Sequence, residues 1–362
     1  MAQGFGAWGN DLYTGRRSYQ IVARRWWWFG LGVLTTLIAV GLLVKPGLTP
    51  GIEFSGGTQF TLNNVKDPSQ DLATSTVLAV APGESPKVVV GQSKMRIQMS
   101  ELPQSDVPEL VTRLAEAFDI TEADISHTFI GPTWGADVSR KTITGIGWFL
   151  VFVLIVMTVY FRNWQMAVAA LVALLHDLVV TVGVYAAVGW EVTPATVIGF
   201  LTILGYSVYD TVVVFDKVRE NTADTLSQMR YTYAEKANLA VNQTLVRSIN
   251  TSVVALLPVG AILVVGAFVQ HAGTLRDLAL ALFVGMAIGT VSSVFLATPM
   301  EVTLRELERP IKAHTRKVLA ARAKAAAAPG LSEEDQKALA KVGQLQPGAH
   351  QGQAAQPRRK KR

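Results

Sequence analysis

The sequence places one carboxylate where a membrane-spanning segment would have to bury it. The stretch GYSVYDTVVVFDKVREN, residues 205–221, begins as the end of an apolar segment and finishes as a charged helix surface. Asp210 precedes the end of the apolar run, about 7 Å along a helix from the polar end. A charge at that depth is costly unless it is paired, hydrated or neutralised. Asp210 is therefore a candidate for binding and releasing protons; the alternative is an interfacial Asp that snorkels or caps its helix.

Arg247 opens another apolar segment, at the same predicted end of the bundle as Asp210. The stretch RSINTS carries hydroxyl and amide groups from this point into the membrane and predicts a hydrated path. A guanidinium within a few ångströms would hold the Asp210 carboxylate ionised, so separating the pair would favour proton uptake. The pair predicts a proton-driven switch; the alternative is an ordinary cation at a cytoplasmic helix start.

His176 and Asp177 form a second polar pair, near the middle of the apolar segment 166–188. Adjacent residues point about 100° apart on a helix, so these two side chains need not contact each other. We expect a second proton relay or a hydrogen-bonding anchor toward the next segment. The alternative is a satisfied packing pair without a role in proton transfer.

Motifs for nucleotide or metal chemistry are missing from the sequence. It contains no G-x-x-x-x-G-K-[ST] loop, no G-x-G-x-x-G after a predicted strand and no H-E-x-x-H, and its five histidines are scattered. The absence of cysteine excludes disulfides and thiolate metal sites. We therefore expect no enzyme activity, metal or cofactor, with energy supplied by an ion gradient or a partner.

Six apolar stretches supply the elements that would position these residues. Of the 362 residues, 50% are hydrophobic and 17% charged, and the mean hydropathy is +0.31, which is typical of a polytopic membrane protein. Each stretch approaches the roughly 20 residues needed to cross a hydrocarbon core. The first is too long for a signal peptide and predicts an uncleaved span. The stretches cover 26–45, 143–161, 166–188, 195–215, 249–268 and 275–298.

Glycines in these stretches predict close helix contacts. Gly285 and Gly289 form a G-x-x-x-G pattern, and Gly199 and Gly205 flank the approach to Asp210. Small residues of this kind most often mark packing between membrane helices, so we do not interpret them as a ligand site.

Residues 46–142, between the first two spans, predict a small α+β domain. GIEFSGGTQFTLNNV and KVVVGQSKMRIQMS each alternate like one strand, and EADISHTFIGP is consistent with a third. SDVPELVTRLAEAFD predicts a helix with Ser105 or Asp106 as its cap. Strands interleaved with helices favour an α+β sandwich.

The distribution of Lys and Arg predicts the orientation of the chain. Residues 1–25, 216–248 and the tail 299–362 carry many of these cations, whereas 189–194 and 269–274 carry none. By the positive-inside rule, both termini are cytoplasmic and the 46–142 domain faces outward. We expect the early part of the basic tail to continue a helix and the rest to be disordered. Its final PRRKKR is expected near anionic lipid or the ribosome instead of nucleic acid.

Several of these segments together resemble SecF, the family of membrane subunits that assist the Sec protein-export channel. GYSVYDTVVVFDKVREN resembles the signature at the end of the family's fourth span, ALLHDLVVTVG its third span and NQTLVRSINTS its fifth. GIEFSGGTQF, with Glu53, Phe54, Gly56 and Gly57, resembles the motif that opens the family's outer domain. The matches occur in the same order across about 26–300. Tyr209 stands where the family usually has Asn, and Glu53 where it usually has Asp.

The resemblance implies half of an RND-type transporter, in the cell membrane as a multi-pass protein, with a ferredoxin-like domain between its first two helices. It implies a pairing with SecD and use of the proton-motive force to promote the late, ATP-independent translocation of unfolded preproteins through SecYEG, after the SecA motor. Asp210 and Arg247 match the family's proton-transport residues. An RND-like half-transporter for lipid or small molecules is the alternative, although such pumps usually carry two outer domains and about twelve spans. A non-transporting insertion factor, a third class, would have no need of Asp210.

Overall fold

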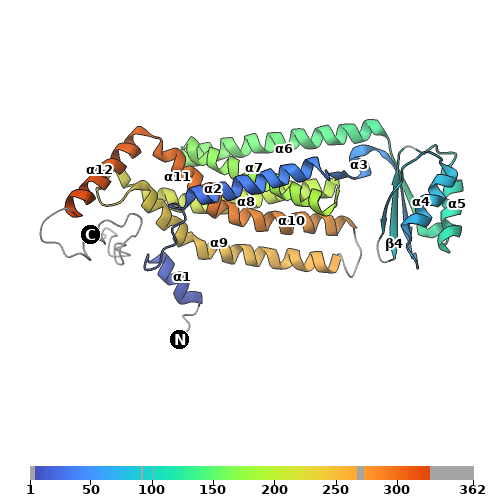
Figure 1. The fold of residues 1–362 in the computed structure, drawn as a ribbon, viewed down its shortest axis with the longest axis horizontal. Coiled ribbons are helices and arrows are strands. Elements are labelled where there is room, and N and C mark those ends of the chain that lie inside the picture. The colour runs from blue at the N-terminus through green and yellow to red at the C-terminus, as the bar shows by residue number, and fades with distance from the viewer. Residues whose placement is uncertain (1–4, 91–92, 101, 267–272, 327–362) are drawn as a thin grey trace, which may run out of the picture.

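A long helical bundle carries a sheet-and-helix domain at one end (Figure 1). The structure is a computed structural model and describes residues 5–90, 93–100, 102–266 and 273–326. The first and last helices of this part, α1 (Phe5–Tyr13) and α12 (Arg309–Ala326), lie at the end opposite the sheet. α1 packs on the bundle through Leu12, which shares a buried cluster with Val241.

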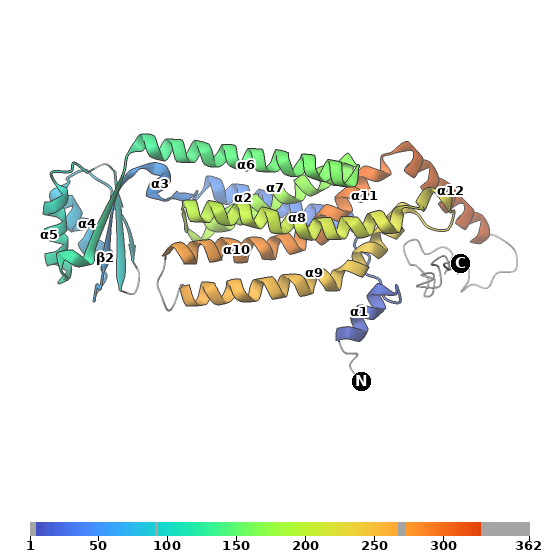
Figure 2. The ribbon, with the colours of Figure 1, turned by 180° about the vertical axis from the view of Figure 1, so that it is seen from behind.

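Six helices of the described chain are long and apolar enough to cross a membrane, which confirms the polytopic helical class. The sixth is continuous through a π-helical segment, η4, that joins α10 to α11. Figures 1 and 2 show the helices side by side along the bundle. Their bounds are α2 (Arg25–Val44), α6 (Pro132–Phe161), α7 (Trp164–Val188), α8 (Pro194–Thr222), α9 (Tyr233–Val264), α10 (Gly273–Ser292), η4 (Ser293–Ala297) and α11 (Thr298–Glu306).

Two of these helices begin well before the apolar stretches that predicted them. α6 begins at Pro132 instead of near residue 143, because Pro132 follows Gly131 and its fixed φ suits a first helical turn. α9 begins at Tyr233 instead of near residue 249, because Thr232 and Glu235 form a reciprocal capping box. Hydropathy locates the apolar part of a helix, whereas caps locate its ends. Residues 132–142 therefore belong to α6, although the sequence assigned them to the α+β domain.

The domain between α2 and α6 contains an antiparallel sheet of four strands. Its order is β3-β4-β2-β5, with β2 at Gly57–Asn63, β3 at Lys87–Val90, β4 at Lys94–Met99 and β5 at Ile125–Ile130. Helices α4 (Gln70–Val80) and α5 (Val107–Phe118) cover the face that points away from the bundle (Figure 1). Phe60, Leu62 and Ile97 from the sheet and Leu110 and Leu114 from α5 are fully buried between these layers.

The domain follows its sequence pattern in part. β5 and α5 confirm the third strand and the predicted helix, and Asp106 occupies the N-cap position of α5 without a side-chain cap bond. KVVVGQSKMRIQMS, predicted as one strand, contains two, β3 and β4, which pair antiparallel. The sequence analysis did not predict α4.

The segment GIEFSGGTQFTLNNV is not one strand, because two glycines interrupt it. Residues Ile52–Ser55 form a short helix, α3, and only Gly57–Asn63 is extended. Gly56 and Gly57 have φ values of 75° and 124°, which residues with a side chain rarely adopt. The chain therefore turns at this point from the bundle into the sheet.

The early part of the basic tail is helical, as its sequence predicted. α11 and α12 cover most of residues 298–326. Arg322 on α12 donates from Nη1 and Nη2 to the two carboxylate oxygens of Glu235, at 2.6 and 2.7 Å, and this interaction raises the pKa of Arg322. The terminal PRRKKR lies outside the described residues.

Glycines bring α8 and α10 close together, as their sequence positions predicted. A Cβ atom on Gly285 would lie 2.2 Å from Cδ1 of Ile203, and one on Gly289 would lie 3.1 Å from Cβ of Ser207. A Cβ atom on Gly199 would lie 2.7 Å from Cβ of Ala281. Gly205 differs, because a Cβ atom there would meet nothing within 4 Å.

The two glycines on α8 provide a matched test of this packing. We expect Gly199→Ala to lower the free energy of unfolding by about 1–3 kcal/mol, because the added methyl overpacks the contact with α10. Gly205→Ala should leave stability unchanged or slightly higher, because the methyl enters open space and alanine favours the helix. Thermal unfolding of the purified chain in detergent measures both, and equal midpoints would contradict this account of the α8–α10 contact.

Candidate functional site

Asp210 lies inside the bundle, held by hydroxyl groups from two other helical segments. Its side chain is on α8, and the residue is 4% exposed. Oδ1 accepts a hydrogen bond of 2.9 Å from Oγ of Ser248 on α9. Oδ2 accepts a short hydrogen bond from Oγ of Ser293, the first residue of η4. The carboxylate thus connects three membrane-spanning elements through groups that carry no charge.

The helix that carries Ser293 changes to π-helical geometry at this residue. A π turn inserts an extra residue into a helix and turns the side chains around it, and such segments are frequent at functional sites. Pro299 follows directly, in the first turn of α11, and cannot donate the backbone hydrogen bond of a regular helix. The local sequence therefore favours a departure from α-helical register beside the buried carboxylate.

Arg247 does not pair with Asp210, contrary to the sequence-based expectation. Within the described part of the chain, no ion pair joins the two residues, and the Arg247 side chain is exposed. The reason is helical geometry, because adjacent residues point about 100° apart. Ser248 faces Asp210, so its neighbour Arg247 must point to another side of α9. The two residues lie at the same end of the bundle but do not contact each other.

His176 and Asp177 do contact each other, and they connect three helices. Nδ1 of His176 lies 3.2 Å from Oδ1 of Asp177, and Nε2 of His176 lies 3.1 Å from Oγ1 of Thr35 on α2. Oδ2 of Asp177 accepts a hydrogen bond of 2.7 Å from Oγ of Ser207 on α8. The pair is thus a hydrogen-bonded anchor from α7 toward α8 and α2, one of the roles that its position suggested.

The two carboxylates lie near each other at one face of α8, because Asp210 is on this helix and Asp177 accepts from Ser207 on it. Ser207 and Asp210 are three residues apart, so their side chains lie on one face of α8. Ser252 on α9 and Thr290 on α10 add a hydroxyl contact of 2.6 Å within the same interior. A hydroxyl both donates and accepts, so it can partner a carboxylate or a carboxylic acid. This interior can therefore accommodate both protonation states of its acids.

Sequence analysis missed two residues of this site, Ser207 and Ser293. Each is a small polar residue in an otherwise apolar stretch, and Ser207 also stands three residues before Asp210. Ser248 and Ser252 were recognised as polar residues entering the membrane. Spacing on α8 would have indicated Ser207, and Ser293 stands four residues after Gly289, which lies on the face of α10 that packs against α8.

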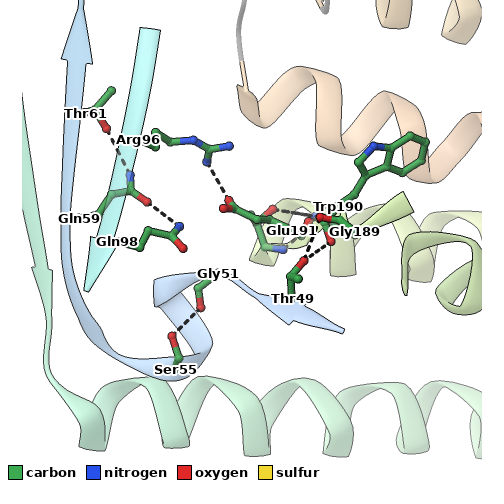
Figure 3. A network of polar contacts seen from close by, with 12 residues as sticks. Thr49, Gly51, Ser55, Gln59, Thr61, Arg96, Gln98, Gly189, Trp190 and Glu191 are labelled. Atoms are coloured by element: carbon green, nitrogen blue, oxygen red, sulfur yellow. Dashed lines mark hydrogen bonds and ion pairs between the residues drawn. The ribbon is translucent and has the colours of Figure 1, made fainter. Parts of the chain in front are cut away.

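A second polar cluster ties the sheet domain to the loop between α7 and α8 (Figure 3). Strand β1 (Thr49–Pro50) pairs in parallel with β6 (Glu191–Val192), and Oγ1 of Thr49 donates to the carbonyl of Trp190 at 2.7 Å. Nη1 of Arg96, on β4, lies 3.0 Å from Oε2 of Glu191, which is 6% exposed. We call the Arg96–Glu191 ion pair together with the β1–β6 pairing the clasp.

The motif residues Glu53, Phe54, Gly56 and Gly57 form a joint between domain and bundle. Glu53 and Phe54 lie in α3, and a Cβ atom on Gly56 would lie 2.9 Å from Cα of Pro132 at the start of α6. A Cβ atom on Gly57 would lie 2.3 Å from the carbonyl oxygen of Met99 on β4. The glycines thus allow backbones to meet, which is a structural role for this motif.

Comparison with known proteins places this geometry in a family context. The family model "Protein export membrane protein SecD/SecF, C-terminal" matches residues 110–307, and "SecD/SecF GG Motif" matches residues 41–63. The chain is 46% identical to "Protein translocase subunit SecF" of Streptomyces coelicolor, over 89% of this chain and 86% of that protein. It is 43% identical to the protein of that name from Mycobacterium tuberculosis, over 85% and 72% of the two chains.

A solved structure matches most of the fold. The crystal structure of SecDF, a translocon-associated membrane protein from Thermus thermophilus, superposes with a TM-score of 0.70 and 28% identity. The match covers 81% of this chain and 39% of the SecDF chain. This chain therefore spans about two fifths of that solved protein.

The hydroxyl partners of Asp210 can be tested through a double-mutant cycle. We expect Ser248→Ala to lower the free energy of unfolding by about 1–3 kcal/mol, because one buried carboxylate oxygen loses its donor. In an Asp210→Asn background the same change should cost less, with a coupling energy of about 0.5–3 kcal/mol. Unfolding of the purified chain in detergent measures all four proteins.

Ser292→Ala is the matched control for this cycle. Ser292 is buried beside Ser293 but donates to the carbonyl of Gly289 on its own helix. Ser292→Ala should lower the free energy of unfolding by the same amount whether position 210 holds Asp or Asn. An equal cost of Ser248→Ala in both backgrounds would show that the Ser248–Asp210 bond contributes nothing.

Proposed function

The chain belongs to the SecD/SecF family of protein-export membrane proteins, as a SecF subunit with a role in protein translocation, and we propose that proton binding at Asp210 drives its part in that work. The observation that carries this proposal is a buried carboxylate that, among the described residues, is held by two hydroxyl groups. An ion pair would favour the charged form, whereas a hydroxyl partner tolerates either form. Asp210 is therefore suited to gain and lose a proton in place.

Protonation changes the bonding that joins three elements. A proton on one Asp210 oxygen turns that acceptor into a donor, so the serine opposite it must rotate to accept. The carboxyl group also loses its charge, which removes the reason for several polar groups to converge on it. The packing of α8 against α9 and η4 then differs between the two forms, and the proton gradient selects between two states of unequal proton affinity.

The available energy limits what this switch can do. One proton crossing 100 mV delivers about 2.3 kcal/mol. That is enough to bias a conformational equilibrium by a few kcal/mol for each proton. It fits a late stage of export, independent of ATP, in which the SecA motor has already begun to push an unfolded preprotein through SecYEG.

We assign the sheet domain to the outer side of the membrane and both termini to the cytoplasm. The Lys and Arg distribution supports this, and α1 and α12 lie at the end of the bundle opposite the sheet. The order β2-α4-β3-β4-α5-β5 agrees with a ferredoxin-like domain. In this orientation the domain faces an emerging polypeptide.

The clasp is the proposed route from the acids to the sheet domain. α7 carries Asp177 and α8 carries Asp210, and the loop between these helices carries Glu191. A shift of α7 against α8 therefore moves one half of the Arg96–Glu191 pair. Because the other half is on β4, the movement reaches the sheet that would contact the preprotein.

SecD is the proposed partner within the membrane. SecDF of Thermus thermophilus is 32% identical to this chain over 36% of its own length, so in that protein a similar segment is joined to additional chain. Large apolar side chains on α9, among them Val254 and Leu257, are exposed and offer a surface for a companion subunit. We place Arg247 on this outer side of α9, where it assists proton passage at the interface with SecD.

We propose that this protein is not an enzyme and needs no cofactor, since proton binding and helix movement suffice for the task. The alternative function is an RND-like half-transporter that exports lipid or small molecules. The two functions differ in cargo. Loss of the protein would leave preproteins in the cytoplasm in the first case and lipid or small molecules in the second.

Asp210→Asn tests the proton switch directly. We expect a secreted precursor to accumulate during pulse labelling, as in a strain without the protein, because Asn cannot exchange a proton at this site. Membrane levels and SecD association must match those of the wild type. Asp216→Asn, on the exposed side of the same helix, is the control and should export normally.

Normal export by Asp210→Asn at matched expression would make Asp210 structural. The coupling would then have to lie in His176 and Asp177 or in SecD. Family membership would stand in that case, whereas the proposed mechanism would not.

Charge exchange across the clasp tests the transmission step. Arg96→Glu and Glu191→Arg should each reduce export, because each leaves like charges opposed at a largely buried contact. The double exchange should restore much of the loss, as a coupled pair requires. Precursor pulse labelling measures export, and a double exchange no better than the single changes would argue against the clasp as a link.

A further inference from the structure

A polar cavity of about 590 Å³ lies at the end of the bundle opposite the sheet domain. It is formed where the turn between α6 and α7 meets the end of α8, η2 (Thr225–Ser227), α9 and α12. Its volume falls within the range of small-molecule sites, roughly 300–1,000 Å³. None of the residues assigned above to proton transfer or to the clasp lines it, so it requires a separate explanation.

The cavity has an excess of positive charge. Arg162, Arg219 and Arg305 line it, and Glu308 is the one acidic residue among its described lining residues. Oε1 of Glu308 accepts from Nη1 of Arg305 at 2.6 Å and from Nε2 of Gln165 at 2.5 Å. Within the described chain, Arg162 and Arg219 make no ion pair with an acid. Nη1 of Arg219 donates a long hydrogen bond of 3.4 Å to the carbonyl oxygen of Tyr160. The positive charges of both guanidinium groups are therefore left for an anion.

A buried hydroxyl in the cavity wall also lacks a partner. Thr225 is 2% exposed, and its Oγ1 makes no hydrogen bond. Nε of Arg305 is likewise buried and unpaired. Buried polar groups are almost always hydrogen-bonded, so each exception calls for an explanation. A bound acceptor oxygen would satisfy both groups, and this observation does not depend on the charge count.

The chemistry of these groups selects the class of ligand. Guanidinium groups bind phosphate through paired, charge-assisted hydrogen bonds, and a hydroxyl donor adds to such a site. Phe161, Leu226 and Ile311 provide an apolar wall beside them. Trp164, also in the lining, is 59% exposed at the start of a membrane-spanning helix, a position where aromatic residues mark the membrane surface.

We propose that this cavity binds the phosphate group of an anion at the membrane surface, through Arg162, Arg219 and the hydroxyl of Thr225. The phosphate belongs either to an acidic phospholipid headgroup or to a free phosphate compound. Basic pockets between membrane helices bind acidic headgroups by the same physics. Occupancy joins the α6–α7 turn to the end of α8, which is the helix that carries Asp210.

The experiment compares two probes on the purified full chain in detergent. Phosphatidylglycerol and phosphatidylcholine are titrated, and bound lipid is counted by native mass spectrometry; inorganic phosphate is titrated in a thermal-shift measurement. Arg162→Gln/Arg219→Gln should weaken the binding of the phosphate-bearing probe at least about tenfold, because two charge-assisted contacts are lost. Arg113→Gln/Lys66→Gln, which removes two exposed cations from the sheet domain, is the matched control and should bind normally.

Thr225→Val keeps the test decisive if the double arginine variant does not fold. The valine replaces a hydroxyl without a protein partner, so the variant should fold and bind the probe several-fold more weakly. Preference for phosphatidylglycerol that depends on these residues identifies a lipid site. Binding of inorganic phosphate with the same dependence, and no lipid preference, identifies a free phosphate compound. If the cavity variants bind each probe as tightly as the wild type and the control do, the proposal is overturned.

Discussion

The hydrogen bonds from two serine hydroxyls to Asp210 are the interaction on which the interior of this bundle depends. They bring α8, α9 and the π-helical segment η4 to one buried carboxylate, and no cation of the described residues pairs with it. A carboxylate in such a place is stable only while its partners converge on it. The placement of three membrane-spanning elements relative to one another therefore depends on how this one side chain is hydrogen-bonded.

The second carboxylate, Asp177, makes a similar contact between α7 and α8. Asp177 bonds to Ser207 on the face of α8 that also carries Asp210, and α7 and α8 meet in the loop that holds Glu191. Side-chain hydrogen bonds thus join η4 to α8 at Asp210 and α8 to α7 at Ser207. The helices α7 and α8 themselves lead from these contacts to the loop that carries Glu191 of the clasp.

The sequence predicted the features that neighbouring residues determine, and it missed those that depend on contacts between distant segments. Hydropathy located all six long helices, and the depth of Asp210 in its segment predicted a buried acid. Helix ends were misplaced where caps, as at Thr232, extend a helix past its apolar part. The partners of Asp210 could not be predicted in the same way, because Ser293 lies 83 residues away in the sequence and Arg247 turns away by one residue's rotation. Such contacts depend on the packing of distant segments.

The length of α6 has a mechanical consequence for the sheet domain. Its 30 residues extend roughly 45 Å at 1.5 Å per residue, well beyond a hydrocarbon core of about 30 Å. The 20 residues of α2 span only that core. α6 therefore acts as a stalk that holds the domain away from the membrane. The close approach of Gly56 to Pro132 fixes the entering chain against this stalk, and the clasp attaches the domain to the bundle at a further point.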